Sequence, residues 1–160
     1  MPWILADDVQ TTIRFTITNL DDTSNTLELL VDPWNPYVKY KPGVEIIIGT
    51  LRDATFGPMV MVGLGGVTTE LFRDVVYRPA PVGVDEASAM LDQLKAVALL
   101  RGFRGAAKAD VAVLSRLIAQ VSLLAARLCD EVSEIELNPV LVHAEGQGVT
   151  IVDALVVTRR

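Results

Sequence analysis

The feature that most constrains the fold is a long apolar stripe in the second half of the chain. Between residues 111 and 128, apolar residues recur every three or four positions, a spacing that places them on one face of a helix. The members of the stripe are Leu114, Leu117, Ile118, Val121, Leu124, Ala125 and Leu128. Asp110 stands directly before the stripe and belongs to the residue types that cap helix N-termini. We therefore predict a helix after Asp110 whose apolar face packs against another layer of structure.

A shorter stripe predicts a second amphipathic helix earlier in the chain. Its apolar members are Ala87, Met90, Leu91, Leu94, Val97 and Ala98. Their spacing is again three or four residues, and Asp85 is placed to cap the start of the helix.

Runs of apolar residues before and after the two helices predict strands. They lie at residues 44–49, 59–62, 70–77, 132–142 and 149–157. The segment 144–148 contains two glycines and joins the last two runs as a hairpin loop. The order of strands, two helices and a hairpin indicates an α+β fold, in which a mostly antiparallel sheet has two main helices packed on it.

The first 41 residues form a separate, β-rich segment. Residues 11–18 alternate apolar and polar side chains, and residues 27–31 form another apolar run, so two strands are expected. Pro33 and Pro36 then interrupt regular structure, because proline removes a backbone donor and restricts the residue before it. We predict two domains: residues 1–41, of unknown role, and residues 42–158.

Composition excludes several classes of protein. The formal net charge of −6 disfavours nucleic acid as a partner, because proteins that bind it gather Lys and Arg on one face. No run approaches the roughly 18 consecutive apolar residues of a membrane-spanning helix, so we expect no membrane partner. The amino terminus has no basic region followed by an apolar run, and the chain has one cysteine, so we expect a cytoplasmic protein.

The predicted hairpin carries the residues best suited to chemistry. Successive side chains of a strand alternate between its faces, so Glu134, Glu136 and Asn138 share one face. The return strand brings Asp153 opposite or diagonal to Asn138, depending on register. Carboxylate and carboxamide oxygens are ligands that Mg²⁺ prefers, and Pro139 favours an edge or bulged position that leaves Asn138 accessible. The alternative is a solvated strand face with ordinary charges.

A glycine run is the second candidate site. Gly63, Gly65 and Gly66 let backbone amides approach an anion closely, and such amides can form a phosphate-binding nest. A turn without a ligand is the alternative, because hairpin turns need the same residues. Glu70, just beyond the run, is either a metal or substrate contact or an exposed strand residue.

Isolated residues elsewhere carry weaker signals. His143 is the only histidine and lies beside the hairpin loop, where we expect a surface position. Cys129 ends the long helical stripe and fits a small buried hydrophobe. Arg101 and Arg104 lie between the helices, where they either bind a phosphate or carboxylate or belong to an interhelical loop.

Five motifs, taken together and in order, resemble those of a known family. They are Pro42-Gly43-Val44-Glu45, Arg52-Asp53-Ala54-Thr55-Phe56-Gly57-Pro58, Gly63-Leu64-Gly65-Gly66 with Glu70, Arg101-Gly102-Phe103-Arg104-Gly105 and Glu134-Ile135-Glu136-Leu137-Asn138-Pro139. Over roughly residues 42 to 158 the chain resembles the carboxyl-terminal part of the ATP-grasp domain of the NDP-forming acyl-CoA synthetases. That family includes ADP-forming acetate-CoA ligase and is related to the β subunit of succinyl-CoA synthetase.

The resemblance implies a part of an enzyme that interconverts acyl-CoA, NDP and phosphate with free acid, CoA and NTP. It implies that Asn138 and Asp153 hold Mg²⁺ with Glu136 beside them, and that ATP or ADP is the substrate nucleotide. Glu136 stands where these synthetases often have Asp. The run from Gly63 to Gly66 and Glu70 would line the nucleotide phosphates.

The resemblance also implies that this chain does not work alone. The lobe that supplies the family's adenine pocket and phosphate-binding lysine has no recognisable counterpart in residues 1–41, and no CoA-binding domain is recognisable. We therefore expect a CoA-binding subunit, a missing ATP-grasp lobe or a second copy of the chain as partner. The alternative is a noncatalytic interaction or assembly module derived from an ATP-grasp lobe, which would bind no nucleotide.

Overall fold

The structure, a computed structural model, describes residues 11–18, 24–31, 43–65 and 74–159. The chain divides into two compact units, Met1–Tyr40 and Lys41–Arg160. In the first unit, β1 (Thr11–Thr18) pairs with β2 (Ser24–Val31) as an antiparallel two-stranded sheet. These two strands agree with the alternation seen in the sequence, although β2 begins three residues before the predicted run at residue 27.

The second unit contains six strands and two α-helices among its described residues. In chain order they are β3 (Val44–Asp53), β4 (Gly57–Leu64), β5 (Val75–Pro79), α2 (Val84–Asp92), α3 (Val111–Arg127), β6 (Val132–Val142), β7 (Val149–Ile151) and β8 (Ala154–Thr158). Two short 3-10 turns, η1 (Val97–Leu99) and η2 (Phe103–Gly105), lie between the helices.

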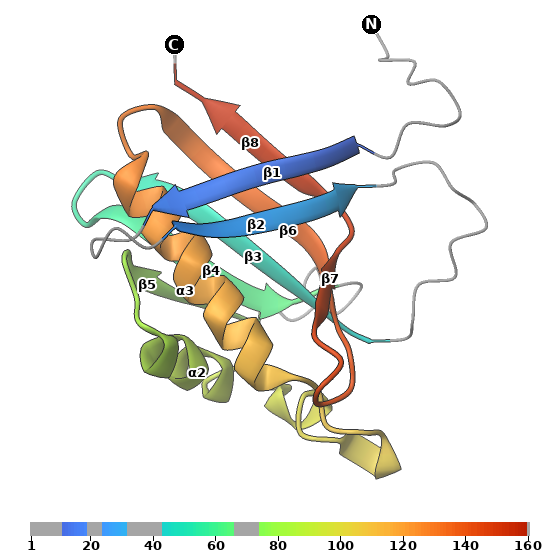
Figure 1. Cartoon of the computed structure of the whole chain (residues 1–160). Helices are drawn as coiled ribbons and strands as arrows, with labels where there is room; N and C mark the ends of the chain where they lie inside the picture. Colours follow the sequence, from blue (N-terminus) through green and yellow to red (C-terminus); the bar gives the residue numbers. More distant parts are fainter. Residues whose placement is uncertain (1–10, 19–23, 32–42, 66–73, 160) are drawn as a thin grey trace, which may run out of the picture. The chain divides into compact units, whose positions relative to one another are not determined.

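All six strands belong to one antiparallel sheet. The order is β5-β4-β3-β6, and both β7 and β8 pair with β6. Both helices lie on one face of the sheet (Figure 1), and α3 contacts β3, β4 and β6. The predicted α+β fold, with a mostly antiparallel sheet and two main helices packed on it, is therefore confirmed.

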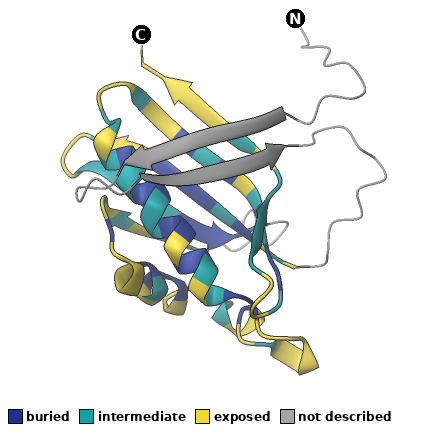
Figure 2. Ribbon diagram, in the orientation of Figure 1, coloured by how far each residue is buried: buried dark blue, intermediate teal, exposed yellow. Residues whose placement is uncertain are grey.

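The core lies between the sheet and α3, where buried residues concentrate (Figure 2). The apolar stripe explains this, because five of its members are buried: Leu114, Leu117, Ile118, Val121 and Ala125. The sheet contributes the alternate residues of its central strands, among them Ile46, Ile48, Val60, Val62, Ile135 and Leu137. Burying one such side chain stabilises the fold by roughly 1.5–3 kcal/mol.

The predicted second helix is shorter than its apolar stripe. Helix α2 ends at Asp92, and Leu94 is buried beyond that end. The backbone N–H groups of Lys95 and Ala96 donate to the carboxylate of Asp74 at 2.8 and 2.9 Å, so they are not used in an α-helix. The predicted cap Asp85 was also wrong, because Gly83 occupies the N-cap position and Asp85 lies in the first turn.

A β-bulge interrupts β6 in the middle of the sheet. Leu137 pairs with Ile48 and Val140 pairs with Ile46, so Asn138 and Pro139 together face the single residue Ile47 of β3. Proline fits such a position because it has no N–H to give to the ladder. The extra residue keeps Val140, like Leu137, on the buried face. The partner run 149–157 breaks at the same level into β7 and β8.

Candidate functional site

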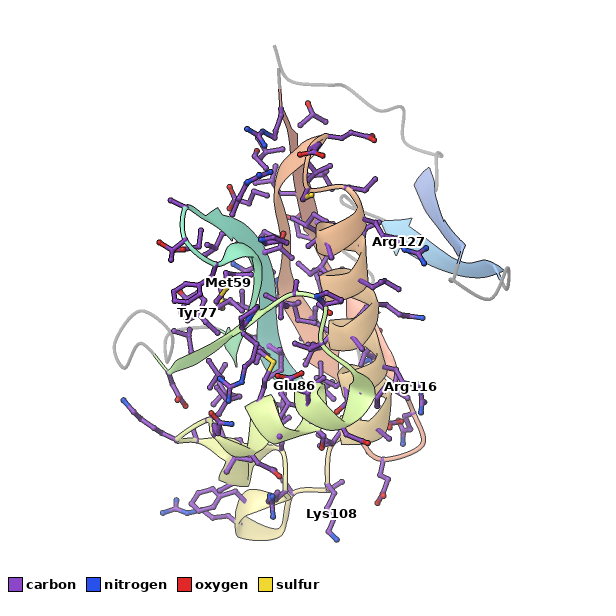
Figure 3. The ribbon with its side chains drawn as sticks, turned by 90° about the vertical axis from the view of Figure 1, so that its left-hand side faces the viewer. Met59, Tyr77, Glu86, Lys108, Arg116 and Arg127 are labelled. Atoms are coloured by element: carbon purple, nitrogen blue, oxygen red, sulfur yellow. The ribbon has the colours of Figure 1, made fainter. Side chains whose placement is uncertain are left out.

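The candidate site lies on the face of the sheet opposite α3. Glu136 belongs to this face because it stands between the buried residues Ile135 and Leu137. Cross-strand neighbours continue the face as a row of residues: Tyr77, Met61, Gly49, Glu136 and Leu155. Figure 3 shows Met59 and Tyr77 on the side of their strands away from α3. Gly49 is buried, and a Cβ there would stand 3.1 Å from Cε of Met61, so the Met61 side chain packs close to this glycine.

The three metal ligands expected from the sequence come together at one end of this row. The backbone N–H of Asn138 donates to the carbonyl oxygen of Asp153 at 3.1 Å, which places the two residues opposite each other. Nδ2 of Asn138 donates to Oε1 of Glu136 at 2.9 Å. Asn138 and Asp153 are exposed and Glu136 is half-buried. The bulge at Asn138 and the break before β8 therefore present their side chains together.

The remaining oxygens of this cluster are of the kinds that Mg²⁺ prefers as ligands. Oδ1 of Asp153 accepts the backbone N–H of Ala154 at 2.8 Å, and the Asn138 amide nitrogen is held by Glu136. In the part of the chain that the structure describes, no hydrogen bond is made to Oδ2 of Asp153 or to Oδ1 of Asn138. The described residues contain no group of three His, Cys, Asp or Glu that could hold a metal. Two protein oxygens suit Mg²⁺, which keeps several waters and takes other ligands from phosphates.

The glycine run is only partly described. Gly66 and Glu70 lie outside the described residues. A Cβ at Gly63 would stand 2.7 Å from Cγ1 of Val75, and one at Gly65 would stand 2.9 Å from Cβ of Glu45. The N–H of Gly65 donates to the carbonyl oxygen of Glu45 at 2.7 Å. Close packing within the sheet therefore accounts for both described glycines without a ligand.

Asp53 organises the turn between β3 and β4. Its Oδ1 accepts the backbone N–H groups of Thr55 and Phe56 at 2.7 and 2.9 Å. These two bonds, that of Phe56 first, hold the pKa of the Asp53 carboxyl below its usual value. Gly57 completes the turn with a φ of 75°, which glycine adopts without strain.

Asp110 has a second role that the sequence did not reveal. As predicted it caps α3, because Oδ1 accepts the N–H of Val113 at 3.3 Å. Its Oδ2 also accepts the N–H groups of Gly146 and Gly148, at 3.0 and 2.9 Å, in the loop between β6 and β7. The bond from Gly148 is the largest cause that lowers the pKa of Asp110, and burial opposes it. No spacing in the sequence links residue 110 to that loop.

His143 is buried, so the predicted surface position was wrong. Its side chain is 6% exposed, and Nε2 lies 2.7 Å from Oγ1 of Thr150. Cys129, expected to be buried, is half-buried beyond the end of α3, where its carbonyl oxygen accepts Nη1 of Arg52 at 2.8 Å. The two arginines between the helices make different contacts. Arg101 forms a salt bridge with Asp92, whereas the guanidinium of Arg104 lies over the ring of Phe103.

Among the described residues, no helix is long and apolar enough to cross a membrane.

Comparison with known proteins shows the family to which the chain is related. A family model described as ATP-grasp domain matches residues 7–158, a range that includes β1 and β2. The β subunit of acetate-CoA ligase [ADP-forming] II of Pyrococcus furiosus is 39% identical over 119 residues, which is 74% of this chain. The 4-hydroxybutyrate-CoA ligase [ADP-forming] of Nitrosopumilus maritimus is 40% identical over 113 residues, 71% of this chain. The chain spans 50% of the first relative's length and 16% of the second's.

Solved structures show the same fold. An acetyl-coenzyme A synthetase of Ca. Korarchaeum cryptofilum, in complex with coenzyme A and Mg-AMPPCP, superposes with a TM-score of 0.68 and 42% identity. The match covers 75% of this chain and 55% of that one. The carboxyl-terminal lobe predicted from the sequence is thus found in a solved relative.

Proposed function

The chain belongs to the ATP-grasp domain family and is homologous to ADP-forming acyl-CoA synthetases, and from that premise we propose that it is the Mg-nucleotide-binding part of an NDP-forming acyl-CoA ligase. The ligase would convert acyl-CoA, NDP and phosphate to acid, CoA and NTP, and ATP or ADP is the proposed nucleotide. The chain spans about half the length of the first relative, so the complete reaction is proposed for an assembly that includes further protein.

The observation that carries the proposal is the pairing of Asn138 with Asp153. Two exposed oxygen-bearing side chains are held opposite each other by a backbone hydrogen bond of 3.1 Å, at a bulge and a strand break. A solvated strand face with ordinary charges requires neither irregularity. A relative of the same fold is known in complex with coenzyme A and Mg-AMPPCP, which supports a Mg-nucleotide site in this family of folds.

Each residue of the cluster has a separate proposed task. Oδ1 of Asn138 and Oδ2 of Asp153 bind the metal, and Glu136 orients the Asn138 carboxamide by accepting its Nδ2 hydrogen at 2.9 Å. When bound, Mg²⁺ neutralises and orients the nucleotide phosphates for phosphoryl transfer. We propose that the nucleotide lies along the row beside the cluster, from Glu136 through Gly49 to Met61.

The glycine run is proposed to shape the site and not to bind the metal. We propose that Gly63, Gly65, Gly66 and Glu70 line the phosphate end of the site through the shape of the backbone. Because the Gly65 amide already donates to Glu45, it is assigned no phosphate bond.

A partner chain follows from the same proposal. The Pyrococcus relative is named as a subunit, and this chain covers half of it. We propose that a CoA-binding subunit, the other ATP-grasp lobe or a second copy of this chain completes the site.

Isothermal titration of the purified chain tests the proposal. ADP and ATP are each titrated with and without Mg²⁺, and the proposal expects binding that requires the metal. Folded protein that gives no heat under any condition would favour the noncatalytic interaction or assembly module instead.

Substitution of the metal ligand sharpens this test. Asp153→Ala should abolish metal-dependent nucleotide binding with little change in thermal stability, because the residue is exposed. Asp85→Ala is the matched control, since Asp85 is an exposed aspartate on α2, beyond the other face of the sheet. Equal binding by both variants would remove the metal site from this position.

A further inference from the structure

The loop between β6 and β7 is tied to the beginning of α3. Asp110, which is 5% exposed, uses one carboxylate oxygen to cap the helix and the other to accept the N–H groups of Gly146 and Gly148. Both glycines have positive φ, 79° and 75°, so the loop backbone takes a shape that other residues rarely adopt. A single carboxylate therefore joins the start of α3 to two loop residues that are 36 and 38 positions further along the chain.

Backbone bonds support the same connection. The N–H of Asp110 donates to the carbonyl oxygen of His143 at 2.8 Å, and the N–H of Glu145 donates to that of Lys108, also at 2.8 Å. Ala109 and Ala144 form an isolated antiparallel bridge. Among these contacts only the Asp110 side chain reaches Gly146 and Gly148, at the far side of the loop.

The position of this loop matters because β7 is short. Only three residues of β7 pair with β6, and Asp153 follows two residues after the strand ends. A slip of one residue along a strand turns every later side chain to the opposite face. Three ladder pairs and the bond from the Val152 N–H to the carbonyl oxygen of Pro139, at 2.9 Å, hold this stretch before β8 pairs with β6 over five positions. The anchored loop adds to these contacts at the β7 end, and so helps to fix the register that sets Asp153 opposite Asn138.

We infer that Asp110 is a positioning residue for the nucleotide-metal site, because its carboxylate fixes the loop whose register sets Asp153 opposite Asn138. The inference rests on the proposed function. Asp110 itself touches neither metal nor nucleotide.

Asp110→Ser separates the two roles of this residue. Serine is a good helix cap, but its side chain is too short to cap α3 and hold the loop together. We expect the dissociation constant for Mg-ADP to rise about tenfold, a typical effect of losing a residue that orients metal ligands. Asp110→Asn should restore most of the affinity, because its carbonyl oxygen can still accept the two glycine N–H groups.

Asp74→Ser is the matched control. Asp74 is also 5% exposed and also accepts two backbone N–H groups, but those belong to Lys95 and Ala96, away from the hairpin. It should lower the melting temperature and leave the Mg-ADP dissociation constant within about twofold of wild type. A rise in the dissociation constant that is equal in the two variants would overturn the inference, because a general loss of stability would then explain both.

Hydrogen exchange gives a readout that needs no nucleotide. The amide of Asn138 donates to Asp153, so its protection reports the pairing directly. Asp110→Ser should speed exchange at Asn138 relative to the core amides, whereas Asp74→Ser should not. Unchanged relative protection would contradict the positioning role. If wild type binds no Mg-nucleotide, the proposed function fails, and the exchange comparison still decides whether Asp110 fixes the register.

A pair of glycine variants keeps the inference testable if Asp110→Ser does not fold. Gly148 and Gly57 both have a φ of 75°, and a Cβ at either would meet nothing within 4 Å. Alanine therefore strains the backbone similarly at both. Gly148→Ala should weaken Mg-ADP binding and Gly57→Ala should not; equal affinities in the two variants would refute the role of the loop.

Discussion

Gly63 illustrates how its neighbours decide what a glycine does. In sequence the run from Gly63 to Gly66 fits a phosphate-binding nest, a type of site built from backbone amides. In the structure Gly63 lies in β4 between Ile47 of β3 and Val75 of β5, and Val75 and the backbone of Asp74 are so near that a side chain has no room. The residue is required by the packing of the sheet.

Replacement of Gly63 by alanine is therefore expected to destabilise the protein without any ligand present. The added Cβ would stand 2.7 Å from Val75 and 3.1 Å from the carbonyl oxygen of Asp74. Overpacking of this kind costs about 1–3 kcal/mol of unfolding free energy. Urea unfolding of Gly63→Ala checks the value. Gly83→Ala is the control, because a Cβ at Gly83 would meet nothing within 4 Å and the φ of Gly83 is negative. A Gly63→Ala variant as stable as this control would contradict the packing argument.

The acidic face was predictable at the residue scale because it depends only on local alternation. Glu136 and Asn138 are two residues apart, so alternation predicts that they share a face, and the hairpin pattern brings Asp153 near them. Asp110 depends on contacts with glycines 36 and 38 residues away, and His143 on a contact with Thr150 across the hairpin. Neither contact leaves a periodic signal in the sequence.

At the scale of elements, the two helices differ in how well the sequence predicts where they end. Helix α3 was predictable in extent because the apolar stripe and the cap agree, and the structure ends it at Arg127, one residue before the prediction. The end of α2 was not predictable. There the Asp74 carboxylate competes for backbone amides that the apolar pattern assigns to the helix. Helices packed on a sheet follow the periodicity of their core residues until another element takes their hydrogen bonds.

The junction between α3 and the hairpin should weaken in acid. The folded state lowers the pKa of Asp110 from 3.8, chiefly through the Gly148 N–H. A lowered pKa stabilises the fold above the unfolded pKa, and that stability is lost as the pH falls through the folded pKa. Asp110→Asn should therefore be less stable than wild type at pH 7, and the difference should shrink below about pH 4. Urea unfolding of both proteins at several pH values measures the difference in stability at pH 7 and its decrease in acid.

Asp53 provides a comparison for this acid effect. Its pKa is lowered in the same direction, by the N–H groups of Phe56 and Thr55, but the carboxylate is exposed to solvent that screens it. Asp53→Asn should also be less stable than wild type at pH 7, but by a smaller difference in unfolding free energy than Asp110→Asn. If the unfolding free energy of Asp110→Asn varied with pH in parallel with that of wild type, the Asp110 carboxylate would not be the source of the acid sensitivity.

At the scale of the whole molecule, the second unit supplies its own core. Within the second unit the buried residues run from Ile46 to His143, and they pack between one sheet and two helices. The strand order explains why topology was harder to predict than the elements themselves. Pairing of β3 with β6 joins residues about 90 apart in the sequence, as Ile46 with Val140, and local patterns carry no information on such pairs.

A chain of residues 41–160 is expected to fold without the first unit, because the described core lies within Lys41–Arg160. Thermal denaturation followed by circular dichroism should give one cooperative transition. A broad, uncooperative transition would show that residues 1–40 complete the core. The full-length chain measured in the same buffer is the reference.

The bulge in β6 makes the number of residues in that strand as important as their chemistry. Before the bulge the odd positions Ile135 and Leu137 face the helices, and after it the even positions Val140 and Val142 do. Deleting one residue at the bulge would therefore reverse the parity of one half of the strand and drive either apolar residues into solvent or Glu136 and Asn138 into the core. Side chains along β6 can be exchanged without this reversal, whereas the number of residues in the strand cannot change. Anyone who transplants this pair of ligands into another sheet must carry the extra residue with them.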